Sequence, residues 1–363
     1  METQTFACCV FLFASIAAES ERVPATPGTT VTIDRPKTER GSVTVRVPSD
    51  YSPRQKYPVI FWYGANGGPV TQIDGGKGWI VVGMSFAKLE RIARIRDYAD
   101  RNWQLCRDVR RHLAKTLSLN KHSYIGGFSK GGNTAYMIAH VAPKDLSGAI
   151  IVGGGKFPAF AVATVTYRKP AAILIGIGNL DINYPLARNA ADQLTRSRAL
   201  VTFVEWPNTG HSTVINEAFK QWFNVQRHRE DEEFKEQARS EITMTLAEDS
   251  KPSFEQYERL AELLKSPEMI FATTTERKKL ERQLTALRSK ADVKKAIAAQ
   301  TAFNDLLAQE AKLTGQLKPN AKALEKLSER FSDFANEHSE SKWKELAAAA
   351  VKRIRKRIGF KDR

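Results

Sequence analysis

The chain has 363 residues, of which 42% are hydrophobic and 26% charged, and these proportions exclude a mostly disordered or a collagenous protein. No apolar run reaches the roughly 20 residues that a membrane-spanning helix needs, which excludes a polytopic membrane protein. The net charge of +16 suits an anionic partner such as nucleic acid, lipid headgroups or an acidic polymer, although a solvated basic surface is the simpler interpretation.

The N-terminal segment carries an apolar run over residues 6–18 (FACCVFLFASIAA). The run is too short to cross a bilayer but has the length of a signal-peptide core, and the small residues Ser15 and Ala17 offer a cleavage site before Ala18. Its leader lacks Lys and Arg, so a buried first strand or helix is the alternative. We expect residues 1–18 to be a signal peptide and the protein to be secreted or periplasmic.

Glycine and proline divide the chain into two parts. Residues 1–221 hold 20 of the 22 glycines and 12 of the 15 prolines. These residues mark tight connections between strands and helices, whereas a region poor in both and rich in Ala, Leu, Glu and Lys is typical of helices. We therefore expect an α/β domain over residues 19–221, followed by an all-helical region over residues 222–363 that is basic at its end.

The first part alternates between strand-like and helix-like segments. Residues 29–34 and 42–48 alternate apolar and polar side chains, which predicts two strands that can pair as a hairpin. The later strand-like runs are 58–63, 79–84, 123–128, 148–153, 171–177 and 200–205, and the helical patterns between them are 97–117, 131–141 and 186–195. Continuous apolar runs are typical of strands buried on both faces. The alternation predicts a wound, mostly parallel sheet with helices on both faces.

The segment Gly127-Phe128-Ser129-Lys130-Gly131 is a G-x-S-x-G motif. It follows one predicted strand and precedes the helical pattern NTAYMIAHVA, which is the context of a nucleophile elbow. The glycines permit the strained turn that exposes the serine hydroxyl above the sheet edge. A tight turn with a bystander serine is the alternative. We expect Ser129 to be a nucleophile.

An acid and a base follow the carboxyl ends of two later strands. Asp181 lies in GNLDINYP and His211 in WPNTGHSTV, at the edge where wound sheets build their sites. Two other aspartates lie between Ser129 and His211. Asp145 falls in a loop before a strand, and Asp192 falls within a helical pattern. For the acid and the base alike, a loop or capping role is the alternative.

These residue types fit three chemical roles. Ser129 is a weak nucleophile until His211, whose ordinary pKa lies near neutrality, removes its proton. Asp181 would fix the imidazole tautomer and stabilise the imidazolium. The oxyanion needs backbone N–H donors, which we expect from Lys130, next to the nucleophile, and from Ala65 in the glycine-rich segment GANGG.

The second part contains three apolar stripes at helical spacing. They are Leu280, Leu284, Leu287 and Ala291; Leu324, Leu327, Phe331 and Phe334; and Trp343, Leu346, Ala350 and Ile354. Such stripes usually form the core of a helical bundle, and Pro252 and Pro319 stand where helices could start. Residues 321–356 faintly resemble a tetratricopeptide-type hairpin, without a regular repeat.

The sequence predicts no metal, cofactor or disulfide framework. The histidines are scattered without an H-x-x-x-H pair. Removal of a signal peptide would take Cys8 and Cys9 with it and leave Cys106 as the single thiol.

With these motifs in place, residues 29–221 resemble secreted α/β-hydrolase esterases of the polyhydroxybutyrate depolymerase, feruloyl esterase and phospholipase/carboxylesterase type. The segments that carry the resemblance are VRVPSDYSPRQKYPVIFWYGANGG, LSLNKHSYIGGFSKGG, GNLDINYP and PNTGHS. It implies a Ser-His-Asp triad of Ser129, His211 and Asp181 that cleaves small or polymeric carboxylic esters through an acyl-enzyme.

Two positions depart from the family. It usually has His-Gly where this chain has Tyr63-Gly64, and a small or uncharged residue where this chain has Lys130. The tyrosine could alter loop packing, and the lysine could favour anionic substrates or block the pocket. The roughly 18 residues between two later strands leave no room for a large cap domain, which predicts an open site.

Two alternatives differ in class from an esterase. A peptidase of the prolyl-oligopeptidase type shares the fold and triad, but no propeller precedes the domain. A non-catalytic platform could instead bind a partner, an anionic polymer or a membrane surface through the basic helical region, whose tail reads KRIRKRIGFKDR. That tail lacks aromatic interleaving beyond Phe360, so nucleic acid is an unlikely partner.

Overall fold

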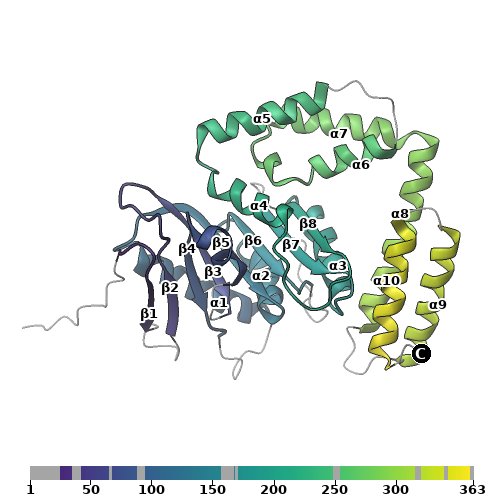
Figure 1. The fold of residues 1–363 in the computed structure, drawn as a ribbon, viewed down its shortest axis with the longest axis horizontal. Coiled ribbons are helices and arrows are strands. Elements are labelled where there is room, and N and C mark those ends of the chain that lie inside the picture. The colour runs from purple at the N-terminus through teal and green to yellow at the C-terminus, as the bar shows by residue number, and fades with distance from the viewer. Residues whose placement is uncertain are drawn as a thin grey trace, which may run out of the picture.

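The computed structural model describes residues 25–34, 42–64, 68–87, 95–156, 167, 171–247, 254–314, 320–338 and 342–359. The predicted signal peptide, residues 1–18, lies outside these ranges, as do Ala65, Pro252 and Pro319. No helix within them is long and apolar enough to cross a membrane. A sheet with its helices forms the first part, and helices alone form the second (Figure 1).

Eight strands of the described chain form one sheet in the order β1-β2-β4-β3-β5-β6-β7-β8. Their bounds are Thr30–Asp34 (β1), Ser42–Arg46 (β2), Tyr57–Tyr63 (β3), Ile80–Met84 (β4), Leu119–Phe128 (β5), Gly148–Val152 (β6), Ala172–Gly178 (β7) and Leu200–Trp206 (β8). The first two strands pair antiparallel as a hairpin, β2 pairs antiparallel with β4, and the remaining pairs are parallel. This is the wound, mostly parallel sheet that the sequence predicts.

Helices cover both faces of the sheet, which explains the continuous apolar runs of its central strands. Successive strand residues point to opposite faces. Val59 and Phe61 belong to the core that includes α1 (Ile95–Leu113), α2 (Lys130–Val141) and α3 (Tyr184–Arg196). Ile60 and Trp62 belong to the opposite core, with α4 (Glu217–Arg227) and the short 3₁₀ turns η1 (Gly68–Thr71) and η2 (Asp74–Gly76) nearby.

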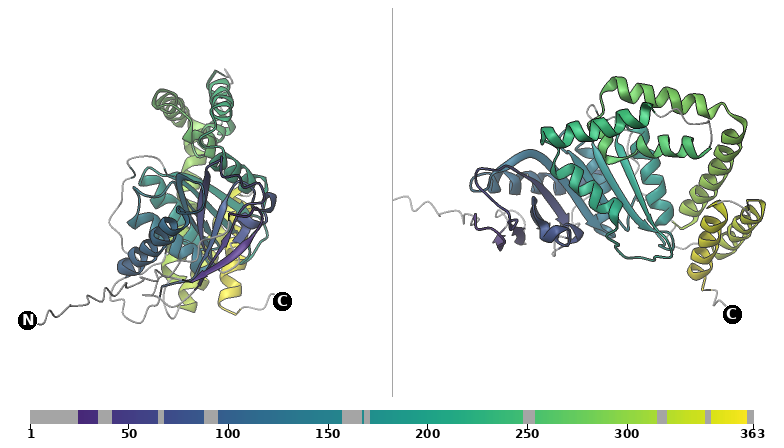
Figure 2. Two further views of the ribbon diagram at one scale, coloured as in Figure 1. Left: turned by 90° about the vertical axis from the view of Figure 1, so that its left-hand side faces the viewer. Right: turned by 45° about the horizontal axis from the view of Figure 1, so that its top comes forward.

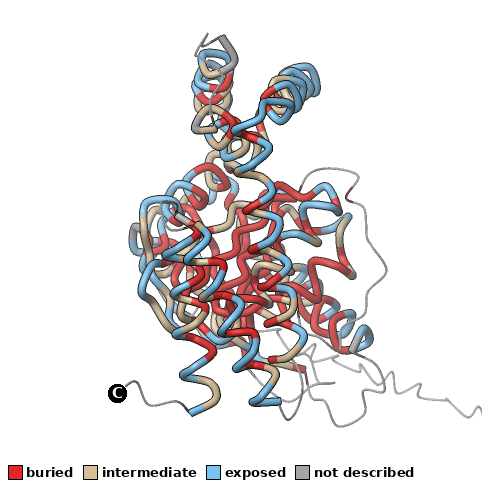
Figure 3. Tube along the Cα trace, turned by 90° about the vertical axis from the view of Figure 1, so that its right-hand side faces the viewer, coloured by how far each residue is buried: buried red, intermediate tan, exposed pale blue. Residues whose placement is uncertain are grey.

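The helical part consists of two groups. The first holds α5 (Glu232–Ala247), α6 (Phe254–Leu263), the 3₁₀ turn η3 (Pro267–Ile270) and α7 (Thr274–Arg288), and the second holds α8 (Ala291–Thr314), α9 (Ala321–Glu337) and α10 (Lys342–Arg357). The first group packs in a small core that also includes Leu200 of β8 and Val293 of α8, whereas other residues of α8 and residues of α9 and α10 belong to the same core as α3. Figure 2 shows the first group rising above the sheet, and Figure 3 shows buried stretches alternating with exposed ones along the helices.

Two details differ from the sequence expectations. Strand β5 begins four residues before the predicted run, so His122 lies within it. The predicted stripe through Leu280 and Ala291 breaks, because α7 ends at Arg288 and Ala291 starts α8. The division expected near residue 222 stays a prediction; α4 spans that residue, and its Trp222 and Phe223 are buried against the sheet.

Candidate active site

The turn after β5 holds Ser129 in a strained conformation, with φ 56° and ψ −115°. Its N–H donates to the carbonyl of Val152, 2.8 Å away. The turn tolerates no side chains at the flanking glycines. A Cβ at Gly127 would lie 2.4 Å from the backbone of Gly131, and one at Gly131 would lie 2.5 Å from the carbonyl oxygen of Tyr63. The sharp turn presents the serine at the N-terminus of α2.

The structure brings the three predicted residues into one hydrogen-bond chain. His211 Nε2 lies 2.9 Å from Ser129 Oγ, and His211 Nδ1 lies 2.8 Å from Asp181 Oδ2. Because a carboxylate only accepts, Nδ1 carries the proton of a neutral ring and Nε2 is free to accept from the serine hydroxyl. Asp181 is 0% exposed, and its second oxygen accepts the N–H of Asn183 at 2.8 Å. The ring of Phe128 packs against His211, with centroids 4.7 Å apart.

The loops that carry the acid and the base are bonded to each other. The N–H of Leu180 donates to the carbonyl of Thr209 at 2.9 Å, and the N–H of Asn179 donates to the carbonyl of Trp206 at 3.0 Å. At Gly178, a Cβ would lie 2.1 Å from the carbonyl oxygen of Thr209. The two loops therefore leave the sheet in close contact, which fixes the separation of Asp181 from the imidazole.

A pocket of about 430 Å³ opens beside Ser129. Its lining residues are Trp62, Tyr63, Gly64, Gly68, Pro69, Gln72, Phe86, Phe128, Ser129, Lys130, Gly131 and Thr213. Lys130 is the only charged residue among the described residues of this lining, and its ammonium lies 4.7 Å from the ring centroid of Phe86. The first N–H groups of α2 lack partners in the helix and can bind an anion at its N-terminus.

The two expected oxyanion donors are Lys130 and Ala65. Lys130 is the first residue of α2, directly after the nucleophile, whereas Ala65 lies outside the described residues. Tyr63 lies outside the hydrogen-bond chain of Ser129, His211 and Asp181. Its side chain is buried, its hydroxyl donates to the carbonyl of Asn102 at 3.2 Å, and its ring stacks on Phe86.

Sequence reasoning missed the pocket residues that come from other loops. Phe86 follows β4, Gln72 follows the η1 turn, and Thr213 lies two residues after His211. Phe86 and Gln72 stand in no motif, Thr213 has no role in the one that contains it, and only the folded sheet brings these loops together. Sequence reasoning also missed Arg353 of α10, which donates to the carbonyl of Asn179 near Asp181. It stands in a basic run that predicts an exposed helix end.

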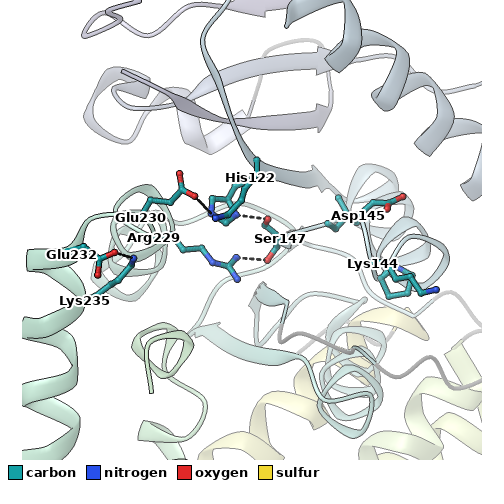
Figure 4. Close-up of a pocket in the computed structure, with 11 residues that line it drawn as sticks. His122, Lys144, Asp145, Ser147, Arg229, Glu230, Glu232 and Lys235 are labelled. Atoms are coloured by element: carbon teal, nitrogen blue, oxygen red, sulfur yellow. Dashed lines mark hydrogen bonds and ion pairs between the residues drawn. The ribbon is translucent and has the colours of Figure 1, made fainter. Parts of the chain in front are cut away.

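A larger pocket of about 820 Å³ lies at the opposite edge of the sheet, where β5 and β6 begin (Figure 4). In it, Ser147 Oγ lies 2.8 Å from Nδ1 of His122, and Arg229 donates to the carbonyl of Ser147 at 3.1 Å. Burial, followed by the charge of Arg229, lowers the pKa of His122 to about 4, although Glu230 opposes the shift. No group of metal-ligating side chains occurs among the described residues.

No protein-family model and no curated protein matches the chain. Solved structures do match it. A thermostable esterase is 19% identical over 50% of this chain and 54% of its own, with a TM-score of 0.40. Esterase 2 of Thermogutta terrifontis, phosphorylated by paraoxon, is 15% identical over 59% of this chain and 95% of its own, with a TM-score of 0.40. A truncated carbohydrate esterase from gut microbiota is 14% identical over 57% of this chain and 98% of its own, with a TM-score of 0.42. These likenesses concern the fold.

Proposed function

We propose that the protein is a serine hydrolase that cleaves carboxylic esters through an acyl-enzyme. The observation that carries the proposal is the hydrogen-bond chain from Ser129 Oγ through His211 to the buried carboxylate of Asp181. A serine, a histidine and a buried carboxylate in this order are the parts that nucleophilic acyl transfer requires. The strained turn at Ser129 adds support, because it exposes the hydroxyl at a helix N-terminus.

The first half of the reaction would acylate the enzyme. His211 Nε2 takes the proton of Ser129 as Oγ bonds to the ester carbonyl carbon, and the carbonyl π electrons move to oxygen. Backbone N–H groups of Lys130 and Ala65 are the expected donors to this oxyanion. As the oxyanion collapses, the bond to the alcohol oxygen breaks, and the imidazolium gives its proton to the departing alcohol.

The second half would release the acid. A water molecule takes the place of the alcohol, and His211 removes its proton as the water oxygen bonds to the acyl carbon. Collapse of the second tetrahedral intermediate returns the electron pair and the proton to Ser129 Oγ. Asp181 keeps its negative charge throughout and stabilises the imidazolium that forms in both halves.

The alternative of a non-catalytic platform that binds partners through its basic tail has less support. Two basic residues of that tail bind groups within the protein, since Arg353 contacts Glu310 and Arg357 donates to the carbonyl of Thr314. The charge of Arg353 is therefore buried and paired, and one donor of Arg357 is already used within the protein. No described contact favours a peptide over an ester as substrate.

Labelling with a fluorophosphonate probe tests the proposal directly, because the probe reacts with activated serines. Wild type should be labelled and should hydrolyse p-nitrophenyl butyrate, whereas Ser129→Ala should do neither. Ser212→Ala is the matched control, because Ser212 is an exposed serine next to His211, and it should keep the label. A folded wild type that takes no label would contradict the proposal, as would Ser129→Ala activity within tenfold of wild type.

A further inference from the structure

A buried ion pair joins α8 to α10 in the helical part. Arg353 of α10 is 3% exposed and Glu310 of α8 is 1% exposed. The guanidinium donates through Nε to Oε1 of Glu310 at 2.7 Å and through a terminal nitrogen to Oε2 at 2.6 Å. Burial alone would lower the pKa of Arg353, but the charge and hydrogen bonds of Glu310 outweigh it and raise that pKa. Arg353 is therefore a fixed cation within the protein.

Two further contacts of this guanidinium lie close to Asp181 in the chain, one in the loop after β7 and one at the start of α3. Its other terminal nitrogen donates to the backbone carbonyl of Asn179. Its carbon lies 4.8 Å from the ring centroid of Tyr184. Asn179 stands two residues before Asp181, and Tyr184 stands three residues after it. Arg353 thus contacts the chain on both sides of the triad acid, although 172 positions separate Arg353 from Asp181 in the sequence.

The contacted residues belong to the structure that orients Asp181. The N–H of Tyr184 donates to the carbonyl of Asp181 at 2.9 Å, which closes the turn that carries the acid. On the other side, the Asn179 peptide is held between Trp206 of β8 and the guanidinium. A displacement of either contact would move the carboxylate relative to His211.

A pair that served only the stability of the helices would not need these charges. Burying two ions costs free energy that their attraction only partly returns, and apolar replacements of similar volume are often neutral or stabilising. A guanidinium, in contrast, offers what an apolar side chain lacks, namely a donor in a fixed plane that reaches a backbone carbonyl. The contact with Asn179 uses that property.

We infer that Arg353 is a positioning residue for the triad acid, and that α8 and α10 thereby complete the active site of the catalytic part. The inference rests on the proposed function. Glu310 holds the guanidinium, and the guanidinium holds the acid loop from outside the sheet. The helical part consequently determines how well Asp181 meets the imidazole, and any event that withdraws α10 from α3 lowers the catalytic rate.

The consequences for kinetics differ from those of simple destabilisation. If the loop shifts, the carboxylate stabilises the imidazolium less, so the acid limb of the kcat/KM profile moves to lower pH. The value of kcat per active site should fall by about 10- to 100-fold, because small misplacements of catalytic groups have effects of that size. KM should change little, because Arg353 does not line the substrate pocket.

The test uses the full chain and counts active sites by fluorophosphonate titration. The main variant is Arg353→Met combined with Glu310→Leu, which removes both charges together and so avoids an unpaired buried ion. Arg353→Lys is the second variant, because it keeps the charge and one donor and should restore part of the rate. Arg357→Met is the matched control, one helical turn further along α10, where the guanidinium donates to Thr314 rather than to the acid loop.

The inference predicts a loss of kcat per titrated site and a shifted acid limb in the double variant, a smaller loss in Arg353→Lys, and wild-type behaviour in Arg357→Met. A double variant with kcat per site within twofold of wild type and an unshifted profile would overturn it. If the double variant does not fold, an Arg353→Lys profile identical to wild type would overturn it as well. Wild type that takes no label would instead contradict the proposed function.

Discussion

At the scale of single residues, the nucleophile turn depends on two glycines that have no chemical role. The chain passes so close to itself that the backbone of Gly131 fills the space that a side chain at Gly127 would need. Backbone atoms in a packed turn cannot rotate away as a flexible side chain can. The position therefore demands glycine because of space, and the hydroxyl of Ser129 is exposed as a result.

The change Gly127→Ala should reduce the free energy of unfolding by about 1–3 kcal/mol or more, because it overpacks a tight turn. Urea unfolding measures the loss, and fluorophosphonate labelling should weaken with it. Gly210→Ala is the control, since a Cβ there meets nothing within 4 Å, and its stability should change by less than about 0.5 kcal/mol. Equal effects of the two changes would contradict the packing argument.

Lys130 gives the substrate pocket its only charge among the described lining residues. The contact of its ammonium with Phe86 holds it at the wall, and the pocket of about 430 Å³ remains open beside it. A carboxylate on the substrate should therefore be attracted, with a modest effect because the side chain is exposed.

We expect Lys130→Met to lower kcat/KM for p-nitrophenyl hydrogen succinate by about fivefold relative to the value for p-nitrophenyl butyrate. Lys130→Arg should keep the wild-type ratio, and added salt should weaken the preference in wild type. A ratio that does not change in Lys130→Met would refute the prediction. If Lys130→Met instead raised the rate for both esters, the lysine would be an obstruction in the pocket.

At the scale of elements, the strands could be predicted because burial on both faces leaves a continuous apolar run. The nearness of Ser129, Asp181 and His211 could be predicted because each follows a strand that ends at the same edge of the sheet. The break between α7 and α8 could not, since Ala291 keeps the helical spacing of Leu284 and Leu287 across the turn. The start of α7, in contrast, is marked in the local sequence, because Thr273 and Glu276 form a capping box there.

Arg353 could not be recognised as buried from its neighbours. It stands between lysines and arginines that predict a solvated helix end, and its partner Glu310 lies 43 positions earlier. Only the packing of α8 against α10 pairs them. Long-range pairs of this kind need the fold, whereas turns, caps and strand patterns are set by a few adjacent residues.

The edge where β5 begins should make the stability of the protein depend on pH. His122 is 7% exposed, and its pKa of about 4 lies below the ordinary value of 6.5. Between these two values the unfolded chain binds a proton that the folded chain does not, so stability rises with pH across this window. The contribution of neutral His122 to the free energy of unfolding is complete above about pH 6.5, and it is lost progressively as the pH falls toward 4.

Thermal unfolding from pH 7 to 4.5 measures this effect. The Tm of wild type should fall over this range, and His122→Gln should flatten the fall because glutamine cannot take the proton. His228→Gln serves as the control, since His228 is only half-buried and lies at the end of α4. A His122→Gln curve with the same slope as wild type would show that other groups cause the acid sensitivity.

At the scale of the whole molecule, the sheet part shares one core with α8, α9 and α10 and a second core with α4. Helix α4 covers a face of the sheet, where Trp222 packs on Tyr124 with centroids 5.9 Å apart and Phe223 packs on Trp79 at 5.8 Å. Helix α8 packs on α3, and Arg188 of α3 donates to Asn304 of α8 at 3.1 Å. The composition changes near residue 222, where the strand-forming sequence ends. Packing against the sheet part continues beyond that residue, through α4 and α8.

Shortened chains should therefore separate two contributions to folding. A chain that ends at residue 221 loses Trp222 and Phe223, each of which contributes about 1.5–3 kcal/mol or more by burial, and we expect it to be insoluble. A chain that ends at residue 230 keeps α4 but uncovers α3, so it should fold with a lower Tm. If Arg353 positions the acid loop, its kcat per titrated site should fall as well. A stable chain ending at residue 221 with full activity would show instead that the sheet part is an independent unit.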